Sequence, residues 1–317
     1  MPRTSVFYPF EVTDARAVLP FAELVRRGPL ERLWLGQSTS VETHHVLAYL
    51  AGAGMTVPMG TAVTLLPLRN PYEAALEARS LAALTEHPFV AGFGSSWELF
   101  VTSVEGKPYA SPRRAMHEYL SCVRTLIDGE VAEVQGEYVN LRSVLGPMAH
   151  PGVEVGAGVL RPAMARTAGA VADVAITTLT PPAYVRDVLV PALRTGAEGR
   201  ERVPRVVTLV HAATEQPGRD PLHLAKTGAI RHMGLPHYGA MLRSAGLEFD
   251  VADQDGCAAA LIEAGLFLTG SPEHIAAELH RYREAGADEV VLNPCGVLVA
   301  EGQDAALRDL ELISAAL

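Results

Sequence analysis

The chain has 317 residues, of which 49% are hydrophobic and 20% are charged, so it can bury a large core. Its formal net charge is −10, and the sequence offers no basic face of the kind that nucleic-acid binding requires. No apolar run reaches the length of a membrane span, and the first residues lack the apolar core and the small-residue cleavage site of a signal peptide. We therefore expect a cytoplasmic protein without a nucleic-acid or membrane partner.

Short apolar, β-branched runs alternate with longer helical patterns along the whole chain. This alternation predicts parallel strand pairing, because parallel neighbours need a crossover connection, and the nearly continuous apolar runs are typical of strands buried on both faces. Eight such units favour an α/β fold of the (β/α)8 TIM-barrel type, with a doubly wound open sheet as the alternative. The predicted strands are residues 4–10, 30–36, 56–66, 89–94, 152–157, 173–178, 205–213 and 288–294.

Helical patterns fill the intervals between these strands. Asn70 is a capping residue before a proline at the first helical position, and Ser111 and Ser271 precede a proline in the same way. The predicted helices cover residues 14–27, 41–54, 70–87, 111–130, a segment from about 162, 182–196, 271–287 and 304–317.

Two segments interrupt the alternation. Residues 130–150 are expected to form a small insertion that contains a hairpin. Residues 214–270 hold two or three helical patterns, and since a structureless loop of that length is unusual, we expect a helical insertion over one end of the barrel that shapes a substrate site. Within it, residues 231–239 (RHMGLPHYG) either line a pocket or form exposed helical turns. The chain 1–317 is thus predicted to be one domain.

Glycine-rich turns follow two of the predicted strands, at residues 92–96 (GFGSS) and 156–158 (GAG). Each alone is explained by a tight turn that needs glycine, and the second departs from a dinucleotide fingerprint because Arg161 occupies the third small position. Together they lie at the carboxyl ends of neighbouring strands, which face the same mouth of a barrel. Backbone N–H groups, hydroxyls and a helix N-terminus bind anions there, so we predict a phosphate-bearing ligand.

Four blocks carry a family resemblance: residues 58–96, 111–139, 153–177 and 268–292. The first spans a strand, a helix and GFGSS, and the second continues with a helix and a Gly-Glu hairpin. The third holds the GAG turn and ends in an Ala-Asp pair and a strand, and the fourth is a Gly-Ser-Pro-Glu helix with the last strand. In this order they resemble the bacterial luciferase-like flavin- or deazaflavin-dependent oxidoreductases.

The resemblance implies a barrel that binds coenzyme F420, or alternatively FMN, at its carboxyl-terminal mouth. It implies a non-proline cis bond at Ala62–Val63 under the tricyclic ring, and a cofactor phosphate against the turns after strands four and five. The cofactor-binding residues that it implies are Ala62, Val63, Gly94, Ser95, Ser96, Gly156, Ala157, Gly158 and Val159.

The sequence departs from the family where relatives carry reactive groups. Many relatives have a histidine after the second strand, where this chain has Gln37 and Ser38. Sugar-phosphate-oxidising relatives have a glutamate after the strand-four turn, where this chain has Trp97 followed by Glu98. His211, near the end of strand seven, either lines the mouth or is a packed histidine. The catalytic residues are therefore unknown, with Ser38, Glu98 and His211 as candidates.

Metal binding is not predicted. His44 and His45 are adjacent, so on a helix their side chains point about 100° apart and do not share a metal as an i, i+4 pair does. Cys122, Cys257 and Cys295 are far apart and form no Cys-x-x-Cys motif, so we expect reduced, mostly buried thiols.

These observations favour an oxidoreductase that uses reduced coenzyme F420 to transfer hydride to an electron-poor C=C or C=N bond of a small organic or natural-product substrate. F420 is preferred because the Ala-, Arg- and Val-rich composition is typical of high-GC genomes in which that cofactor is common. An FMN-dependent luciferase-like monooxygenase is the alternative, because both cofactors present a phosphate and a flat ring to the same turns. A cofactor-free barrel acting as a binding protein is the second alternative. Relatives often dimerise, which leaves a homodimer open.

Overall fold

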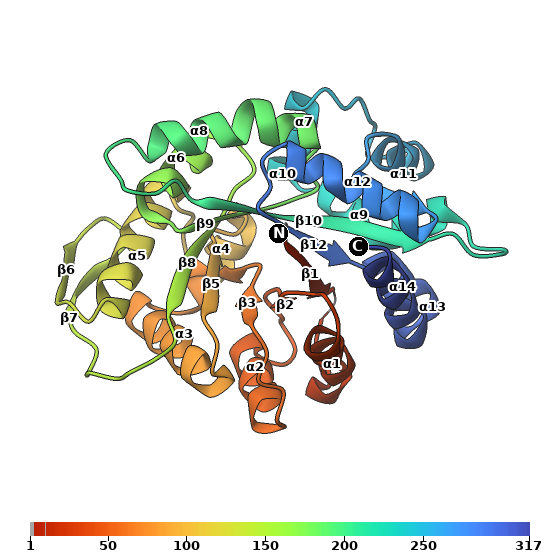
Figure 1. Ribbon diagram of the computed structural model, residues 1–317. Helices are drawn as coiled ribbons and strands as arrows, with labels where there is room; N and C mark the ends of the chain where they lie inside the picture. The colour runs from red at the N-terminus through yellow and green to blue at the C-terminus, as the bar shows by residue number, and fades with distance from the viewer. Residues whose placement is uncertain (1–2, 10) are drawn as a thin grey trace.

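The computed structural model describes residues 3–9 and 11–317, so residue 10, the end of the predicted first strand, lies outside the described residues. Eight parallel strands form a closed barrel, since the last of them, β12, pairs with both β10 and β1 (Figure 1). The predicted (β/α)8 barrel is confirmed, and its closure excludes the open sheet. In order around the barrel the strands are β1 (Arg3–Tyr8), β2 (Leu33–Leu35), β3 (Met59–Thr61), β5 (Phe89–Gly94), β8 (Val153–Gly158), β9 (Val174–Thr178), β10 (Arg205–Thr214) and β12 (Glu289–Asn293); β4 (Thr64–Leu65) and β11 (Phe267–Gly270) are short additions.

The third predicted strand, residues 56–66, is interrupted. The Ala62–Val63 peptide bond between β3 and β4 is cis, at the position that the family resemblance implied. Both residues of this bond reach across to the second strand: the Ala62 N–H donates to the Leu35 carbonyl at 2.8 Å, and the Val63 carbonyl accepts from the Gln37 N–H at 2.9 Å. The chain then pairs with β5 as β4, so the interruption lies at the carboxyl end of the barrel.

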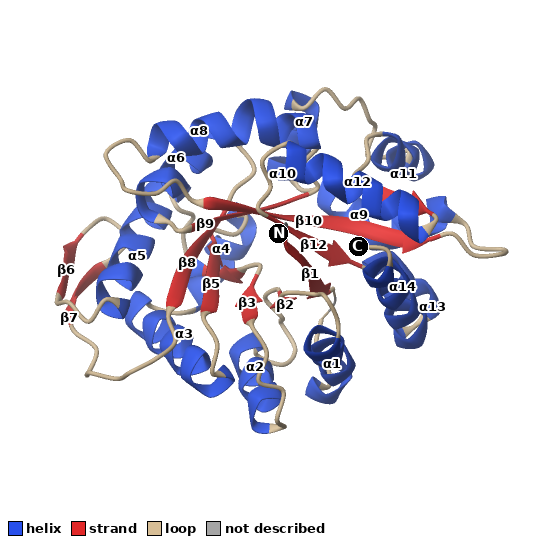
Figure 2. Cartoon of the chain, in the orientation of Figure 1, coloured by secondary structure: helices blue, strands red, loops and turns tan. Residues whose placement is uncertain are grey.

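Helices surround the strands on the outside (Figures 1 and 2). The predicted caps are present: the Asn70, Ser111 and Ser271 side chains each accept the N–H of the residue three positions later. No helix within the described ranges is both long and apolar enough to cross a membrane. The helical elements are η1 (Ala15–Val18), α1 (Leu19–Arg27), α2 (Thr43–Gly52), η2 (Leu66–Leu68), α3 (Pro71–Thr85), α4 (Glu98–Glu105), α5 (Pro112–Ile127), α6 (Pro162–Val171), α7 (Pro182–Tyr184), η3 (Val185–Leu189), α8 (Val190–Gly196), α9 (Pro221–Met233), α10 (Pro236–Ser244), α11 (Gln254–Glu263), α12 (Pro272–Glu284), α13 (Cys295–Glu301) and α14 (Gln303–Ala315).

Both predicted insertions are present. Residues 130–150 contain the antiparallel hairpin of β6 (Ala132–Gln135) and β7 (Asn140–Ser143), at the left edge of Figure 1. Residues 214–270 contain helices α9, α10 and α11, but they end in a strand, β11, that the sequence patterns did not predict. β11 pairs with the carboxyl half of β10 and has four residues, which is too short to show a periodicity. The two-turn helices α4 and α13 were missed for the same reason.

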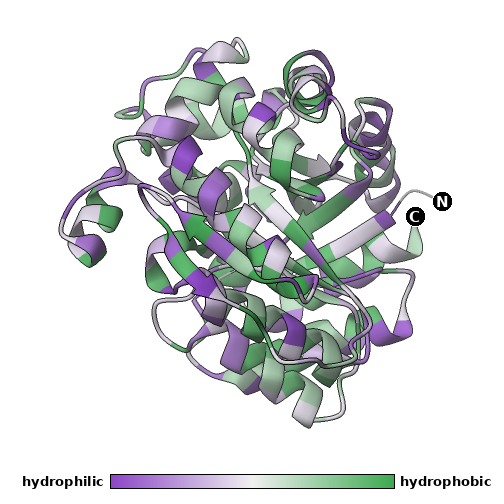
Figure 3. Ribbon diagram, turned by 90° about the vertical axis from the view of Figure 1, so that its left-hand side faces the viewer, coloured by the Kyte–Doolittle hydropathy of each residue, from purple (hydrophilic) through white to green (hydrophobic). Residues whose placement is uncertain are grey.

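Apolar side chains fill the barrel and the space between strands and helices. Many of the hydrophilic residues lie on the outer helices and the connecting loops (Figure 3). Large side chains inside the barrel form a cluster separate from the outer core, which makes the interior a packed core rather than a pore. Phe7 and the two residues of the cis bond pack against this cluster. Its members are Trp34, Val90, Val174, Ile176, Val207, Leu209 and Val291.

The amino-terminal end of the barrel is closed by buried charges. Glu289 is fully buried, and its carboxylate accepts hydrogen bonds from the Ser5 hydroxyl at 2.6 Å, the Trp34 indole at 2.7 Å and the Arg205 guanidinium at 2.8 Å. Arg205 also makes a two-pronged contact with Glu154 at 2.8 and 2.9 Å. Glu289, Arg205 and Glu154 therefore each have an opposite partner, whereas the buried Arg32 at the same end donates to the Met59 and Pro88 carbonyls at 3.0 Å.

Candidate functional site

A cavity of about 270 Å³ lies at the carboxyl-terminal mouth of the barrel, where active sites of this fold are built. Its walls are the cis bond Ala62–Val63, the segment 95–97 after β5, the end of β8 and the α9–α10 corner of the insertion. A larger cavity of about 380 Å³ is lined by α3, α4 and α5 outside the barrel, and the cis bond does not reach it. The mouth cavity is therefore the candidate site.

The turn after β5 supplies two hydroxyl groups to the cavity. Ser95 and Ser96 both line it, and Ser96 has φ of 65°, a left-handed conformation that few non-glycine residues adopt. The Ser96 hydroxyl is buried and has no hydrogen-bond partner among the described residues. A buried polar group without a partner costs free energy, so a ligand atom that bonds this hydroxyl is favoured.

The turn after β8 lies slightly later than the sequence analysis expected. Gly156 and Ala157 are buried within the strand, whereas Gly158 and Val159 line the cavity. Helix α6 begins at Pro162, and no side-chain hydrogen bond caps its first turn. Its free N–H groups and helix dipole favour an anion beside this turn.

Two glycines of β5 make room for the interrupted strand. A Cβ atom on Gly92 would lie 2.1 Å from the Thr61 carbonyl oxygen, and one on Gly94 would lie 2.7 Å from Val63 Cγ2. The Thr61 hydroxyl also accepts the Gly92 N–H at 2.8 Å and donates to the Gly92 carbonyl at 3.0 Å. Gly94, expected beside a phosphate, thus packs against the cis-bond residue and does not line the cavity.

Neither Ser38 nor Glu98 lines the cavity. The Ser38 hydroxyl donates to the Glu11 carboxylate at 2.9 Å, which the Thr39 N–H also contacts at 2.7 Å. Burial raises the pKa of Glu11, but these hydrogen bonds more than offset it and hold the pKa below its usual range. Glu98 is exposed at the start of α4. Ser38 is thus a buried residue bonded to Glu11, and Glu98 belongs to an exposed helix end.

His211 does not line the cavity and is 1% exposed. Its ring stacks on Phe267 of β11 with 6.1 Å between the ring centroids, and its Nε2 is 3.5 Å from the Asn293 amide nitrogen. Burial, with a smaller contribution from His232, lowers the pKa of His211 to about 3. It is therefore a neutral packed imidazole, the simpler of the two sequence interpretations.

The insertion brings three polar rings to the cavity: His232, His237 and Tyr238. The His232 ring packs edge-on against Tyr238 with 5.0 Å between centroids, and His237 lies 4.8 Å from the same tyrosine. Burial lowers the pKa of both histidines and raises that of Tyr238. Sequence reasoning left residues 231–239 open between pocket and surface. The structure divides them: His232, Leu235, His237 and Tyr238 line the pocket, and Arg231, Gly234 and Pro236 are exposed.

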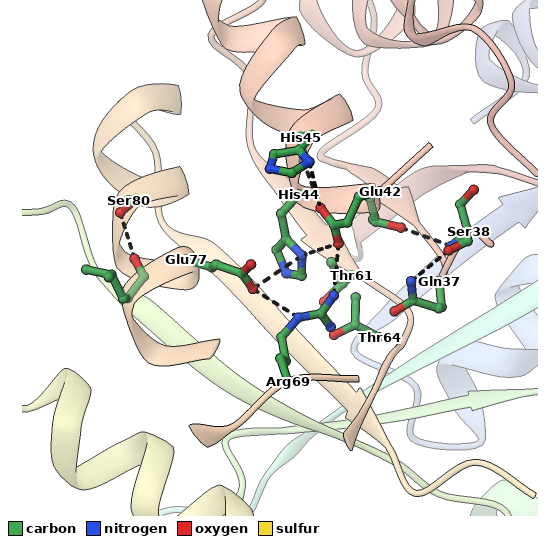
Figure 4. Close-up of polar contacts among 12 residues, drawn as sticks. Gln37, Ser38, Glu42, His44, His45, Thr61, Thr64, Arg69, Glu77 and Ser80 are labelled. Carbon is green, nitrogen blue, oxygen red and sulfur yellow. Dashed lines mark hydrogen bonds and ion pairs between the residues drawn. The ribbon is translucent and has the colours of Figure 1, made fainter. Parts of the chain in front are cut away.

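A separate polar cluster lies beside the mouth (Figure 4). His44 Nδ1 is 2.9 Å from Glu42 and 3.5 Å from Glu77, and Arg69 contacts the same two carboxylates at 2.9 and 3.1 Å. Burial raises the pKa of Glu42, but hydrogen bonds from His44 and His45 and the charges of His44 and Arg69 bring it to about 2. This is an ion-pair cluster.

No three His, Cys, Asp or Glu residues gather as a metal site requires anywhere in residues 3–9 and 11–317. Cys122, Cys257 and Cys295 are unpaired and buried, as expected.

The comparisons with known proteins place this geometry in a family. The family model described as luciferase-like monooxygenase matches residues 3–289. No curated protein sequence matches the chain. Solved structures share the fold at low identity. A coenzyme F420-dependent tetrahydromethanopterin reductase from Methanopyrus kandleri has a TM-score of 0.76 at 17% identity, covering 99% of this chain and 100% of that one.

Two further solved structures extend the likeness. An F420-dependent secondary alcohol dehydrogenase in complex with an F420-acetone adduct has a TM-score of 0.74 at 17% identity, covering 98% of this chain and 99% of that one. The monooxygenase RslO1 from Streptomyces bottropensis has a TM-score of 0.73 at 16% identity, covering 99% and 98%. With the family model matched over nearly its whole length, the chain belongs to the luciferase-like monooxygenase family.

Proposed function

We propose that the protein is an oxidoreductase that uses reduced coenzyme F420 to transfer hydride to an electron-poor C=C or C=N bond of a small organic or natural-product substrate. The observation that carries the proposal is the mouth cavity, which combines the cis bond Ala62–Val63 with the unpartnered Ser96 hydroxyl. Two solved structures that share the fold are described as F420-dependent.

The residues at the mouth fit a phosphate and a flat ring. Ser95, Ser96, the Gly158–Val159 turn and the N-terminus of α6 would hold the phosphate with hydroxyl and N–H donors, and no carboxylate lines the cavity to repel it. Ala62 and Val63 would support one face of the ring. When bound, the reduced deazaflavin supplies the hydride.

The chain's own residues position the reactants and exclude water. Leu65, Leu160, Ile176, Leu209 and Leu235 give the cavity apolar walls, which limit the water beside a reacting bond. No charged acid or base lines the cavity, so a hydroxyl, a neutral imidazole or a water molecule would supply the proton that completes a reduction.

An FMN-dependent monooxygenase is the second candidate. The matching family model is described as luciferase-like monooxygenase, and a Streptomyces monooxygenase shares the fold. FMN presents a phosphate and a flat ring as the deazaflavin does, so the same two turns would hold it. The two functions therefore differ in the cofactor that the mouth prefers.

The test is an anaerobic titration of the protein with oxidised and reduced coenzyme F420 and FMN, followed by absorbance and fluorescence. We expect tighter binding of the deazaflavin. Tighter binding of FMN would replace the proposal with oxygen chemistry, and binding of neither would leave a cofactor-free barrel.

A serine variant connects the titration to the site. Ser96→Ala should weaken cofactor binding about 10-fold, because one hydrogen bond to an anionic group contributes about 1.5 kcal/mol or more. It should not lower stability, since it removes a buried hydroxyl without a partner. Ser80→Ala on α3, where the hydroxyl donates only within its own helix, is the matched control and should bind as the wild type does.

A further inference from the structure

Two helices begin beside the wall of the mouth cavity, α6 from the barrel and α10 from the insertion. Leu160 precedes α6 and Leu235 precedes α10, and both leucines line the cavity. No side-chain hydrogen bond caps the first turn of either helix, so free backbone N–H groups and the positive end of each helix dipole lie near this wall. An anion bound there would meet both helix starts.

Arg161 and His237 lie at these two helix starts. Arg161 is the residue immediately before α6, and its side chain is exposed and makes no hydrogen bond or ion pair with a residue that the structure describes. His237 is the second residue of α10 and lines the cavity. Burial and, to a smaller extent, the positive charge of Arg161 lower the pKa of His237, so the guanidinium lies close to this ring.

The charges that act on this corner of the mouth are basic. Arg161 acts on His237, and Arg231 and His237 act in the same direction on the neighbouring His232, since each lowers the pKa of the histidine beside it. The chain as a whole has a formal net charge of −10. A basic corner in an acidic protein favours an anionic ligand at that position.

The phosphate of the proposed cofactor has the matching charge. Ser96, Gly158 and Val159 line the same cavity, and the Ser96 hydroxyl is buried without a partner among the described residues. These groups offer hydrogen-bond donors but no positive charge. A guanidinium adds the charge and up to two parallel N–H donors, which is the geometry that phosphate oxygens accept.

We propose that Arg161 and His237 form a phosphate clamp between α6 and α10, in which Arg161 is the counterion of the cofactor phosphate and His237 donates a hydrogen bond beside it. The proposal rests on the proposed function and deepens it, because it assigns a phosphate-recognising cation to the same site. Arg161 acts as a specificity-determining residue that favours a phosphorylated cofactor over the same ring system without phosphate. The insertion thereby takes part in cofactor binding.

The first test compares ligands that differ in their phosphate. FMN is titrated into the full chain beside riboflavin, and coenzyme F420 beside its phosphate-free deazaflavin. Arg161→Gln should weaken binding of the phosphorylated ligand about 10-fold, because a charge-assisted contact is lost, and leave the phosphate-free ligand unchanged. The difference should shrink in about 1 M NaCl, where the Debye length is about 3 Å and an exposed charge is screened.

Two further variants separate the clamp from general charge and from folding. Arg166→Gln is the matched control, since it removes an exposed positive charge further along the same helix, and it should bind every ligand as the wild type does. Arg161→Lys keeps the charge without the planar fork and should recover part of the affinity. Because the Arg161 side chain is exposed, urea denaturation should find the stability of its variants unchanged.

The ring of His237 reports on the clamp without any cofactor. In protein labelled with 15N at histidine, inorganic phosphate should raise the pKa of His237, because an anion beside the ring stabilises the imidazolium. Arg161→Gln should raise this pKa in the free protein, since a repelling charge is removed, and should abolish the response to phosphate.

The outcomes distinguish the two proposals. If FMN binds more tightly than the deazaflavin and Arg161→Gln weakens FMN but not riboflavin, the proposed function fails and the clamp stands. If neither cofactor binds, the proposed function also fails, and a pKa of His237 that does not respond to inorganic phosphate then overturns the clamp. The clamp is likewise overturned if Arg161→Gln weakens both members of a pair equally, or neither, or if Arg166→Gln has the same effect.

Discussion

The two ends of the barrel differ in the charge and the hydrogen bonding of their buried polar groups. At the amino-terminal end, the buried carboxylate of Glu289 has three hydrogen-bond donors, and Arg205 bridges it to Glu154. At the carboxyl-terminal end, the cavity lining has no formal charge, yet Ser96 Oγ is buried without a partner among the described residues. In this barrel, paired carboxylate and guanidinium groups mark the structural end, and uncharged side chains line the end that would meet a ligand.

Removing Glu289 should have the largest effect. Glu289→Ala leaves the Arg205 charge, the Ser5 hydroxyl and the Trp34 indole without their shared acceptor, so we expect a loss of about 3–5 kcal/mol in the free energy of unfolding. Urea denaturation measures it. Glu289→Gln, which keeps an oxygen acceptor, should lose less, and cofactor affinity per folded molecule should not change. A loss below about 1 kcal/mol for the alanine variant would contradict the structural role assigned to the buried charges at the amino-terminal end.

A substitution at Gly92 tests how closely β5 packs against the strand beside the cis bond. In Gly92→Ala the new Cβ would overlap the Thr61 carbonyl oxygen, which is backbone and cannot move aside. We expect a loss of about 3 kcal/mol in stability, because overpacking displaces the strand beside the cis bond. Weaker cofactor binding should accompany it. Gly146→Ala, where no atom lies within 4 Å of the added Cβ, is the matched control, and an equal loss there would contradict this explanation.

The lowered pKa of His211 predicts that the protein loses stability in acid. Its folded-state pKa of about 3 lies below the unfolded value near 6.5, so the unfolded chain binds the proton first. The stability that depends on the neutral ring is present above pH 6.5 and is lost as the pH falls toward 3. Between pH 7 and pH 5 this amounts to about 2 kcal/mol.

Denaturation at several pH values checks this prediction. His211→Phe keeps a flat ring over Phe267 and has no titrating nitrogen, so it should lose about 2 kcal/mol less than the wild type over the same range. Equal slopes for the two proteins would show that His211 is not the group that titrates.

Sequence reasoning reached the parts of the molecule that local patterns specify. The periodicity of strands and helices predicted the barrel. A proline after a capping residue predicted where α3, α5 and α12 begin, and the hairpin within residues 130–150 was also predicted. The position of the cis bond came from the family resemblance, because a dipeptide such as Ala62–Val63 has no local signal of its own.

The features that depend on distant partners were not predicted. Closure of the barrel brings together four distant residues: Ser5, Trp34, Arg205 and Glu289. No local sequence pattern around any of them indicates the other three. The cavity wall at His232 depends on how α9 and α10 fold over the mouth. The candidates Ser38, Glu98 and His211 were placed near the correct end, but the direction of each side chain is set by neighbours such as Glu11 and Phe267.

A substitution at Ser38 should have the smallest effect on stability. It compares a paired hydroxyl, Ser38, with an unpaired one, Ser96, within the carboxyl-terminal end. Its hydroxyl donates to Glu11 and accepts the Ser40 N–H at 3.1 Å, so Ser38→Ala should cost about 1 kcal/mol of stability. Cofactor titration of this variant should match the wild type, because Ser38 does not line the cavity. Ser96→Ala should behave in the opposite way, with stability retained and cofactor binding weakened. If Ser38→Ala instead weakened cofactor binding, a hydroxyl that is paired within the protein would be part of the binding site, and the contrast between Ser38 and Ser96 would fail.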